Sequence, residues 1–210
     1  MSSMLEELAG ALGGDTLGQL AGALGGADND LVSKGVAAAL PALLGGLARN
    51  ARQPEGANAL ANALGNDHDG SIMDSLGSIF GGNQWAQQQA NRHGESILGH
   101  LFGGSRGQVE QQVQAASGLN AGMVTKLLPL LAPVVLGYLG KKMSGGGANQ
   151  IAESLEQERV AVKQNDGAFG QILDMLDGDD DNGGGGLMDM AGDLLQGQAG
   201  KMILGKLLGG

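Results

Sequence analysis

The stretch DNDLVSKGVAAALPALLGGLARN, residues 28–50, decides the fold because the chain contains it twice. Residues 118–142, GLNAGMVTKLLPLLAPVVLGYLGKK, match it at an offset of 92 positions, which places Pro41 on Pro133. In the same register valine falls on valine, lysine on lysine, serine on threonine and a central glycine on glycine. So many like-for-like matches indicate an internal duplication, and a search for repeats comes first in interpreting a sequence.

Both stretches are predicted to be long helices. In the first, valines and leucines recur at i, i+3 and i+4, which is the spacing of one helix face. Asp28 and the two residues after it offer side-chain oxygens that can cap this helix, and the second helix follows from Asn120. A proline inside a helix lacks an N–H and clashes with the preceding turn. The helices are therefore predicted to kink or divide at Pro41 and at Pro129 and Pro133.

Composition indicates an all-α fold. Aromatic residues make up only 2% of the chain, so a core must consist of Leu, Ala, Val, Ile and Met, which suits closely packed helices. Glycine accounts for 41 of 210 residues and shows no collagen period. Since a glycine inside a helix costs roughly 0.5–1 kcal/mol relative to alanine, we expect many short helices with glycine at their ends, and no sheet.

The duplication predicts two domains, residues 1–104 and 105–210. GESILGHLFGG closes the first half at residue 104, and the chain ends on the similar ILGKLLGG. Each domain is expected to be a bundle of short helices around one helix–Pro–helix unit. The second also carries a Gly-rich acidic loop at 177–186 and a C-terminal amphipathic helix at 201–208.

The remaining segments predict shorter helices. Residues 5–26 contain LAGALGG twice and predict two short amphipathic helices, which form a hairpin or act as an arm that adds to a neighbouring molecule. Residues 71–80 are expected to form a helix that buries Ile72 and Phe80, and the Gln- and Asn-rich segment 83–93 is an exposed connection or a polar helix. Further helices are predicted at 57–64, 109–116, 148–177 and 187–195.

Three motifs carry a family resemblance: LPALLGGL at residues 40–47, HDGSIMDSLG at 68–77 and GESILGHLFG at 94–103. In this combination and order the chain resembles the YidB-like bacterial proteins, a family catalogued as a domain of unknown function. The resemblance covers residues 30–140. It implies a compact all-helical domain, described for one branch as containing a homeodomain-like arrangement of helices, and it implies no established activity.

Charge and hydropathy bound the partners. A formal net charge of −10 opposes binding to nucleic acid and to anionic lipid, so no nucleic-acid partner is expected. The longest apolar run, residues 127–140, has 14 residues and two prolines. A membrane span needs about 20 residues, so we expect a buried helix there and no transmembrane span. Residues 1–14 lack the features of a secretory signal, and a cytoplasmic location is expected, with export by another route left open.

The acidic loop at 177–186, DGDDDNGGGG, is the candidate for a metal site. An EF-hand loop needs oxygen ligands at positions 1, 3, 5 and 12 and glycine at position 6. With Gly183 at position 6, the chain supplies oxygens at positions 3, 5 and 12 but a glycine at position 1. Asp177, Asp179 and Asp181 add carboxylates. Two interpretations stay open, a Ca²⁺ site at these three aspartates or a solvated turn, and no other cofactor is expected.

No catalytic constellation emerges from the sequence. Cysteine is absent, and His68, His93 and His100 have no partner ligand at i+3 or i+4, so a zinc site is not expected. The chain lacks a nucleophile elbow, a Walker loop and an HExxH helix. The glycine run at 183–186 follows acidic residues, which have the wrong sign to cradle phosphate. We therefore expect a protein that is not an enzyme.

The expected function is self-association. Two copies of a helical unit give two like surfaces, which either pack on each other in a closed monomer or meet in a neighbouring copy. Leucine stripes in excess of aromatic filler favour the second, so the predicted partner is the chain itself, in a homo-oligomer or filament. The alternative is a monomeric module that binds a partner helix or an apolar ligand between its halves, steadied by Ca²⁺. The predicted interface residues are Leu40, Leu43, Leu44 and Leu47, then Leu131, Val134, Val135 and Leu139 in the second copy, and Ile203, Leu204 and Leu207 near the C-terminus.

Overall fold

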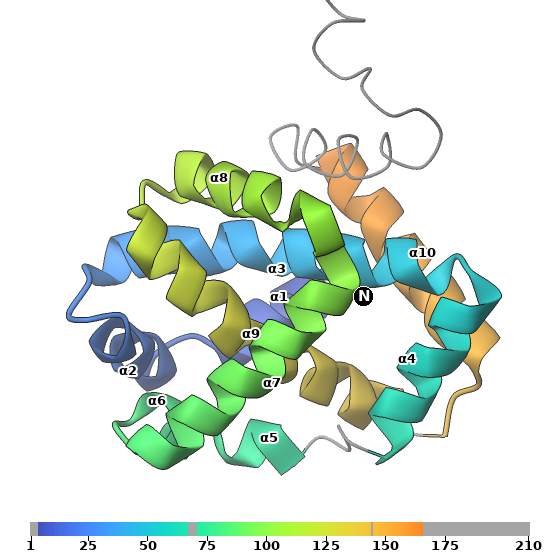
Figure 1. The fold of residues 1–210 in the computed structure, drawn as a ribbon, viewed down its shortest axis with the longest axis horizontal. Coiled ribbons are helices and arrows are strands. Elements are labelled where there is room, and N and C mark those ends of the chain that lie inside the picture. The colour runs from blue at the N-terminus through green and yellow to red at the C-terminus, as the bar shows by residue number, and fades with distance from the viewer. Residues whose placement is uncertain (1–3, 67–70, 144, 166–210) are drawn as a thin grey trace, which may run out of the picture. The chain divides into compact units, whose positions relative to one another are not determined.

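Two long helices, α3 (Asn29–Ala51) and α9 (Ala121–Lys142), form the centre of the fold. The computed structural model describes residues 4–66, 71–143 and 145–165. Every residue from 38 to 48 in α3 and from 127 to 140 in α9 is buried. A helix buried on all sides must be covered on all sides, and Figure 1 shows α3 and α9 crossing with the other helices around them.

Four of the described helices around the centre have four to nine residues, as glycine at helix ends predicts, whereas the longest two have 18 and 19. The part of the chain that the structure describes contains no strand, and the predicted all-α class is confirmed. In chain order the surrounding helices are α1 (Met4–Ala11), α2 (Asp15–Ala23), α4 (Pro54–Asn66), α5 (Ser71–Asp74), α6 (Leu76–Phe80), α7 (Gln84–Phe102), the 3₁₀ turn η1 (Gly103–Ser105), α8 (Arg106–Ser117) and α10 (Ala148–Asn165).

Both central helices begin at a side-chain cap. The Asp28 carboxylate accepts hydrogen bonds from the N–H groups of Asp30, at 2.8 Å, and Leu31, at 3.4 Å. The Asn120 side-chain oxygen accepts from the N–H of Met123 at 2.9 Å. These bonds satisfy N–H groups that the first turn of a helix leaves free. The predicted cap at Asp28 is confirmed, and Asn120 lies at the equivalent position of the second stretch.

Neither central helix divides at its prolines, so of the two predicted outcomes, kinking and division, the second does not occur. Pro133 has no N–H to offer to the carbonyl of Pro129 one turn earlier. Instead α7 lies against that carbonyl. A Cβ built on Gly94 would stand 1.8 Å from the Pro129 oxygen, so only glycine permits the approach, and its Cα–H can contact the carbonyl. Pro41 frees the carbonyl of Ala37 in the same way, but Ala37 is exposed and water can satisfy it.

Two further glycines set the distance between helices. A Cβ on Gly35 of α3 would lie 2.4 Å from a methyl of Leu119 and 2.9 Å from a methyl of Leu127 in α9. A Cβ on Gly46 would lie 2.6 Å from the ring of Phe102 in α7. At Gly46, as at Gly35, the missing side chain permits close approach between helices.

The polar segment 83–93 and the motif GESILGHLFGG do not form separate elements. They form the single helix α7, which buries a stripe at i+4 spacing: Ala90, Gly94, Leu98 and Phe102. The glutamines at its start lengthen the helix, and Gln84 and Gln88 are exposed. In contrast, the helix expected at 71–80 is split into α5 and α6, and Ile72 is half-buried rather than buried.

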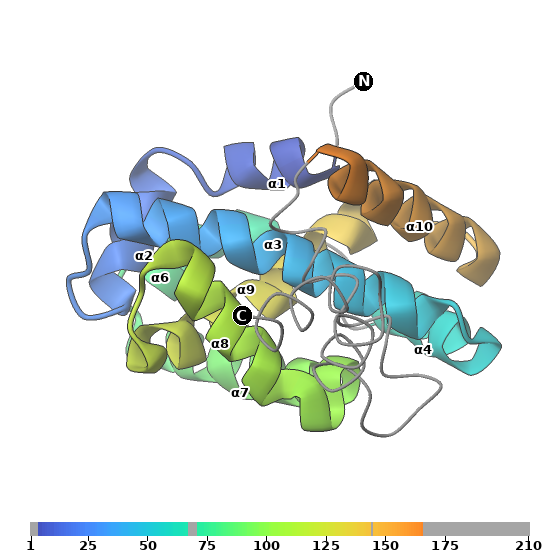
Figure 2. The same cartoon turned by 90° about the horizontal axis from the view of Figure 1, so that it is seen from above.

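The predicted domain boundary at residue 104 falls inside η1. Helices from the two sides of it pack together, because α3 contacts both α8 and α10 (Figure 2). All of the described residues fall in one compact unit. Residues 166–210 lie outside the described residues. The division into domains 1–104 and 105–210, the duplication itself and the helices expected at 187–195 and 201–208 therefore stay predictions.

Replacing Gly94 with alanine is expected to lower the free energy of unfolding by about 3 kcal/mol, because the new methyl group would overlap the Pro129 carbonyl. The matched control is Gly99→Ala. Gly99 lies on the same helix with nothing within 4 Å of a built Cβ, so this change should raise stability by about 0.5–1 kcal/mol. Urea unfolding followed by circular dichroism measures both. Equal effects of the two substitutions would contradict the close approach of α7 to α9.

Candidate interaction surfaces

The predicted interface residues on the central helices lie in the core. None is more than 2% exposed. The sequence therefore identified the apolar face correctly as helical but not its neighbours, which are helices of the same chain. In the closed chain these side chains present no surface to another molecule. The residues concerned are Leu40, Leu43, Leu44, Leu47, Leu131, Val134, Val135 and Leu139, whereas Ile203, Leu204 and Leu207 lie outside the described residues.

The central helices are also long and apolar enough to cross a membrane by length and composition alone. Each has a mean hydropathy of 1.6 over its most apolar window, and 78% of that window is buried inside the fold. Core helices of proteins that never enter a membrane pass the same test. The apolar composition of α3 and α9 is matched here by burial against their own chain.

Helix α1 packs in a site formed by α3, α9 and α10, which is called its seat below. Leu8 and Leu12 are no more than 1% exposed, and Met4 is buried beside them. Figure 2 shows α1 lying along α3, with its first turn near the later part of α10. Burial of a leucine side chain contributes about 1.5–3 kcal/mol, so an eight-residue helix that would not be stable alone is ordered by this seat.

Polar contacts hold the first turn of α1 in the seat. At its start, the N–H of Leu5 donates to Oε1 of the buried Glu158 in α10 at 2.9 Å. Two residues on, the Glu7 carboxylate accepts hydrogen bonds from Nζ of Lys142, at 2.7 Å, and from the hydroxyl of Tyr138. Lys142 also donates to the Tyr138 hydroxyl at 3.0 Å and lies 5.5 Å from the ring centroid. A carboxylate at the first turn suits the free N–H groups of a helix N-terminus.

Glu7, Tyr138 and Lys142 shift one another's pKa values. The hydrogen bond from Lys142, followed by that from Tyr138, lowers the pKa of Glu7 below its ordinary 4.5. Burial, together with the hydrogen bond to Glu7, raises the pKa of Tyr138. Burial opposes the charge on Lys142, but its hydrogen bonds to Glu7 and Tyr138 outweigh this effect and raise its pKa. The cluster therefore keeps an ionised Glu7 facing an ionised Lys142.

The connection from α1 to α2 consists of Leu12, Gly13 and Gly14. Both glycines are exposed. Gly14 has φ 62° and ψ −132°, a conformation that residues with a Cβ rarely adopt, and no atom lies within 4 Å of a Cβ built on it. No side chain caps α2 at this position. Of the three connecting residues only Leu12 packs its side chain in the core, so side-chain packing does not fix the two glycines.

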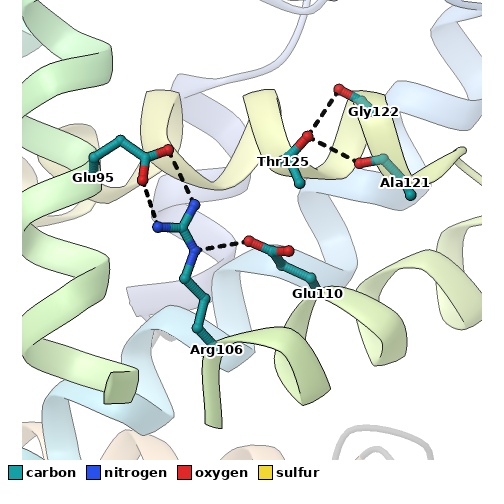
Figure 3. A network of polar contacts seen from close by, with 6 residues as sticks. All are labelled: Glu95, Arg106, Glu110, Ala121, Gly122 and Thr125. Carbon is teal, nitrogen blue, oxygen red and sulfur yellow. Dashed lines mark hydrogen bonds and ion pairs between the residues drawn. The ribbon is translucent and has the colours of Figure 1, made fainter. Parts of the chain in front are cut away.

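A second polar cluster joins α7 to α8 across η1 (Figure 3). The Arg106 guanidinium donates to both oxygens of Glu95 and to Oε1 of Glu110, the latter at 2.8 Å. This pairing lowers the pKa of Glu95 and raises that of Arg106. The neighbouring Thr125 hydroxyl donates back into its own helix, to carbonyls one turn earlier. The ion pairs fix the corner between α7 and α8. Because they are partly exposed, each contributes only about 0–1 kcal/mol to stability.

An open groove of about 550 Å³ lies between the start of α4 and α10. Its apolar lining is alanine and proline, the rest of its lining is polar, and Arg52 and Glu156 approach to 3.5 Å across it. Because α4 precedes and α10 follows residue 104, the groove lies between the two predicted halves. Its lining residues are Ala51, Arg52, Pro54, Ala57, Asn149, Ala152, Glu153, Glu156 and Gln157.

The predicted metal residues cannot be placed. Asp177, Asp179 and Asp181 lie outside the described residues, as does His68, so the Ca²⁺ site stays a prediction. His93 is exposed. His100 Nδ1 is 2.7 Å from the carbonyl of Ser96 one turn earlier. Within residues 4–66, 71–143 and 145–165, no three histidine or acidic side chains gather as metal ligands would.

Sequence reasoning missed the residues that hold α1. Glu7, Tyr138, Lys142 and Glu158 belong to no motif, and the contacts between them and α1 span 131 to 153 positions. A single tyrosine in a chain so poor in aromatic residues was the available hint. It gave no indication of the partner.

Comparison with known proteins gives one match. The family model described as "Bacterial protein of unknown function (DUF937)" matches residues 6–142. The matched region runs from α1 to the end of α9, so it includes both central helices and crosses residue 104. No curated protein and no solved structure matches the chain. The predicted resemblance to a bacterial family of unknown function is confirmed.

Replacing Lys142 with methionine is expected to raise the pKa of Glu7 toward 4.5 and to speed amide exchange in α1. Because the folded pKa of Glu7 is depressed, its contribution to stability is present above 4.5 and is lost as the pH falls below that value. The free energy of unfolding of the variant should therefore fall less than that of the natural chain as the pH drops below 4.5. NMR titration of the Glu7 carboxyl and hydrogen exchange of residues 5–11 measure both effects.

Lys141→Met is the matched control, since it removes the same charge from the adjacent exposed position. It should leave both the Glu7 titration and the exchange of α1 unchanged. Equal shifts in the two variants would mean that Glu7 responds to net charge and not to its hydrogen bond with Lys142.

Proposed function

Because this chain belongs to DUF937, a bacterial protein family of unknown function, we propose its role from geometry: it is a non-enzymatic helical protein that associates with copies of itself. The proposal assigns it a structural or assembly role. Its partner is the same chain, in a homo-oligomer or a filament.

The observation that carries the proposal is the meeting of α3 and α9 at equivalent positions. Gly35 and Leu127 are separated by the offset of 92 that relates the two stretches, and they are in direct contact. A surface that meets its own equivalent is self-complementary, which is the property of an isologous interface. This contact is already made within one chain, so it supports association only in that the unit can pack on a near-copy; copies in other chains must meet through faces that it leaves uncovered.

Association must use surfaces other than the buried leucine stripes. Those side chains are already covered by the chain's own helices. The apolar residues proposed near the C-terminus, Ile203, Leu204 and Leu207, keep their place in the proposal as contacts between copies. The net charge of −10 opposes association, because like-charged copies repel one another. Apolar contacts or an exchanged arm are therefore needed to hold copies together.

Size-exclusion chromatography with light scattering at micromolar concentration should give a mass above the 21.0 kDa of one chain. Deleting residues 202–210 removes apolar contacts and should lower the associated fraction at equal concentration. A uniform mass of 21.0 kDa across the concentration range would show the chain to be a monomer and would remove the proposal.

The groove between α4 and α10 favours a second candidate, a monomeric module that binds a partner helix or an apolar ligand between its halves. Its alanine and proline lining can receive an apolar group, while the polar lining residues Arg52, Glu153 and Glu156 can orient a polar one. In this case the loss of residues 202–210 should leave partner binding intact, whereas in the first case it should lower the associated fraction.

Filling the groove tests the second candidate. Ala152→Trp places an indole in the groove and should abolish the fluorescence of bound anilinonaphthalene sulfonate, an apolar probe, in the folded chain. Val160→Trp is the control, since Val160 is exposed on the same helix and does not line the groove. The same fluorescence in both variants would count against a ligand in this groove.

A further inference from the structure

We propose that α1 is an exchangeable arm: in the associated form, α1 of one copy occupies the seat formed by α3, α9 and α10 of a second copy. This inference rests on the proposed function, because it names the contact through which copies of the chain associate. For residues 5–26 the sequence left two interpretations open, a hairpin and an arm that adds to a neighbouring molecule. This inference favours the arm.

The seat makes no distinction between the chain's own α1 and that of a copy. The polar contacts of α1 join Leu5 to Glu158 and Glu7 to Lys142, pairs that lie 153 and 135 positions apart. None of these contacts depends on the short connection that ties α1 to α2. A second copy brings the same carboxylate and the same leucines to the same seat.

The buried side chains of α1 make a second copy the natural occupant. Leu8 and Leu12 are fully covered in the seat. Whenever α1 leaves, both its own apolar face and the face that it covered become exposed to water. Only a helix with the same spacing of apolar side chains and a carboxylate at the position of Glu7 restores every contact, and the helix that has these features is α1 of another copy.

The connection to α2 supplies the hinge. Gly13 and Gly14 are exposed and have no side chains. With α1 folded back on its own chain, Gly14 has a φ of 62°, which glycine adopts readily and residues with a Cβ rarely adopt. Opening changes the backbone at these two residues and leaves α2, which begins at Asp15, as it is. Exchange by movement of a short terminal element about a hinge is a low-cost route to dimers.

The order of the chain also favours exchange. α1 precedes α9 and α10 in the chain, so its seat is complete only after those helices have been synthesised. Until then the apolar face of α1 is uncovered, and contacts between elements so distant in sequence form slowly. A second copy at sufficient concentration can fill the seat during that interval.

Crosslinking between two single-cysteine variants tests the exchange. The natural chain has no cysteine, so Glu7→Cys on one chain and Lys142→Cys on another provide one thiol each. Both positions are partly exposed, with 41% and 35% of their side chains accessible. After the two full-length variants are refolded together, a short bismaleimide should join them into a covalent dimer, identified by mass spectrometry of the linked peptides.

Two controls define the result. The double variant with both cysteines on one chain, refolded at high dilution, should crosslink within the chain and so shows that the reagent spans the pair. Glu95→Cys mixed with Arg106→Cys places the thiols on the α7–α8 corner, which does not exchange. This mixture should give no covalent dimer by the same reagent.

A hinge variant tests the proposal with the Glu7 contacts intact. Gly14→Ala penalises the closed conformation at φ 62° and should raise the ratio of associated to single chains about fivefold. Gly18→Ala, inside α2 with nothing near its Cβ, is the matched control and should leave the ratio unchanged.

The outcomes separate this inference from the proposed function. Covalent dimers from the Glu7→Cys and Lys142→Cys mixture alone, with more association in Gly14→Ala, support the exchange. Association by light scattering without these dimers, although the double variant crosslinks internally, overturns the exchange and leaves self-association standing. A chain that stays single at every concentration overturns both.

Discussion

The mutual burial of two helices that are apolar on every side is the constraint on which the rest of this structure depends. No residue between 38 and 48 in α3 or between 127 and 140 in α9 reaches the surface. The surrounding helices must therefore come close, and glycine sets how close. At Gly35, Gly46 and Gly94 a Cβ would overlap a neighbouring helix. At these positions glycine provides contact area rather than flexibility.

Proline acts on the same contacts in a way that propensity alone does not suggest. Pro133 leaves the Pro129 carbonyl without its partner in the helix, and the backbone of α7 at Gly94 lies against it. The helix stays continuous because a neighbour, not a kink, accommodates the missing bond. α1 depends on the far end of the same helix, where Tyr138 and Lys142 receive Glu7. The family match ends at residue 142, so Glu158 and the rest of α10 add to this seat from outside the matched region.

How far the sequence predicts this protein differs between local and distant features. Asp28 as a helix cap and the helical spacing of the leucines are local, and each is found in the structure. The sequence could not show that segment 83–93 continues into the motif after it as one helix. A glutamine-rich segment has no apolar period strong enough to distinguish a helix from a connection. The burial of the predicted interface residues on the central helices could not be predicted for a different reason: periodicity reports an apolar face and not what covers it. Leu40 and Leu139 are as apolar in the core as they would be between copies.

The sequence by itself determined the helical class, the family and the two central helices, since these follow from local spacing, composition and motif order. Only the tertiary structure decided that the leucine stripes face inward and that α1 is held by Glu158 and Lys142, because contacts across more than a hundred positions leave no periodic trace in a single chain. Burial is a property of neighbours, and neighbours are chosen by the whole fold.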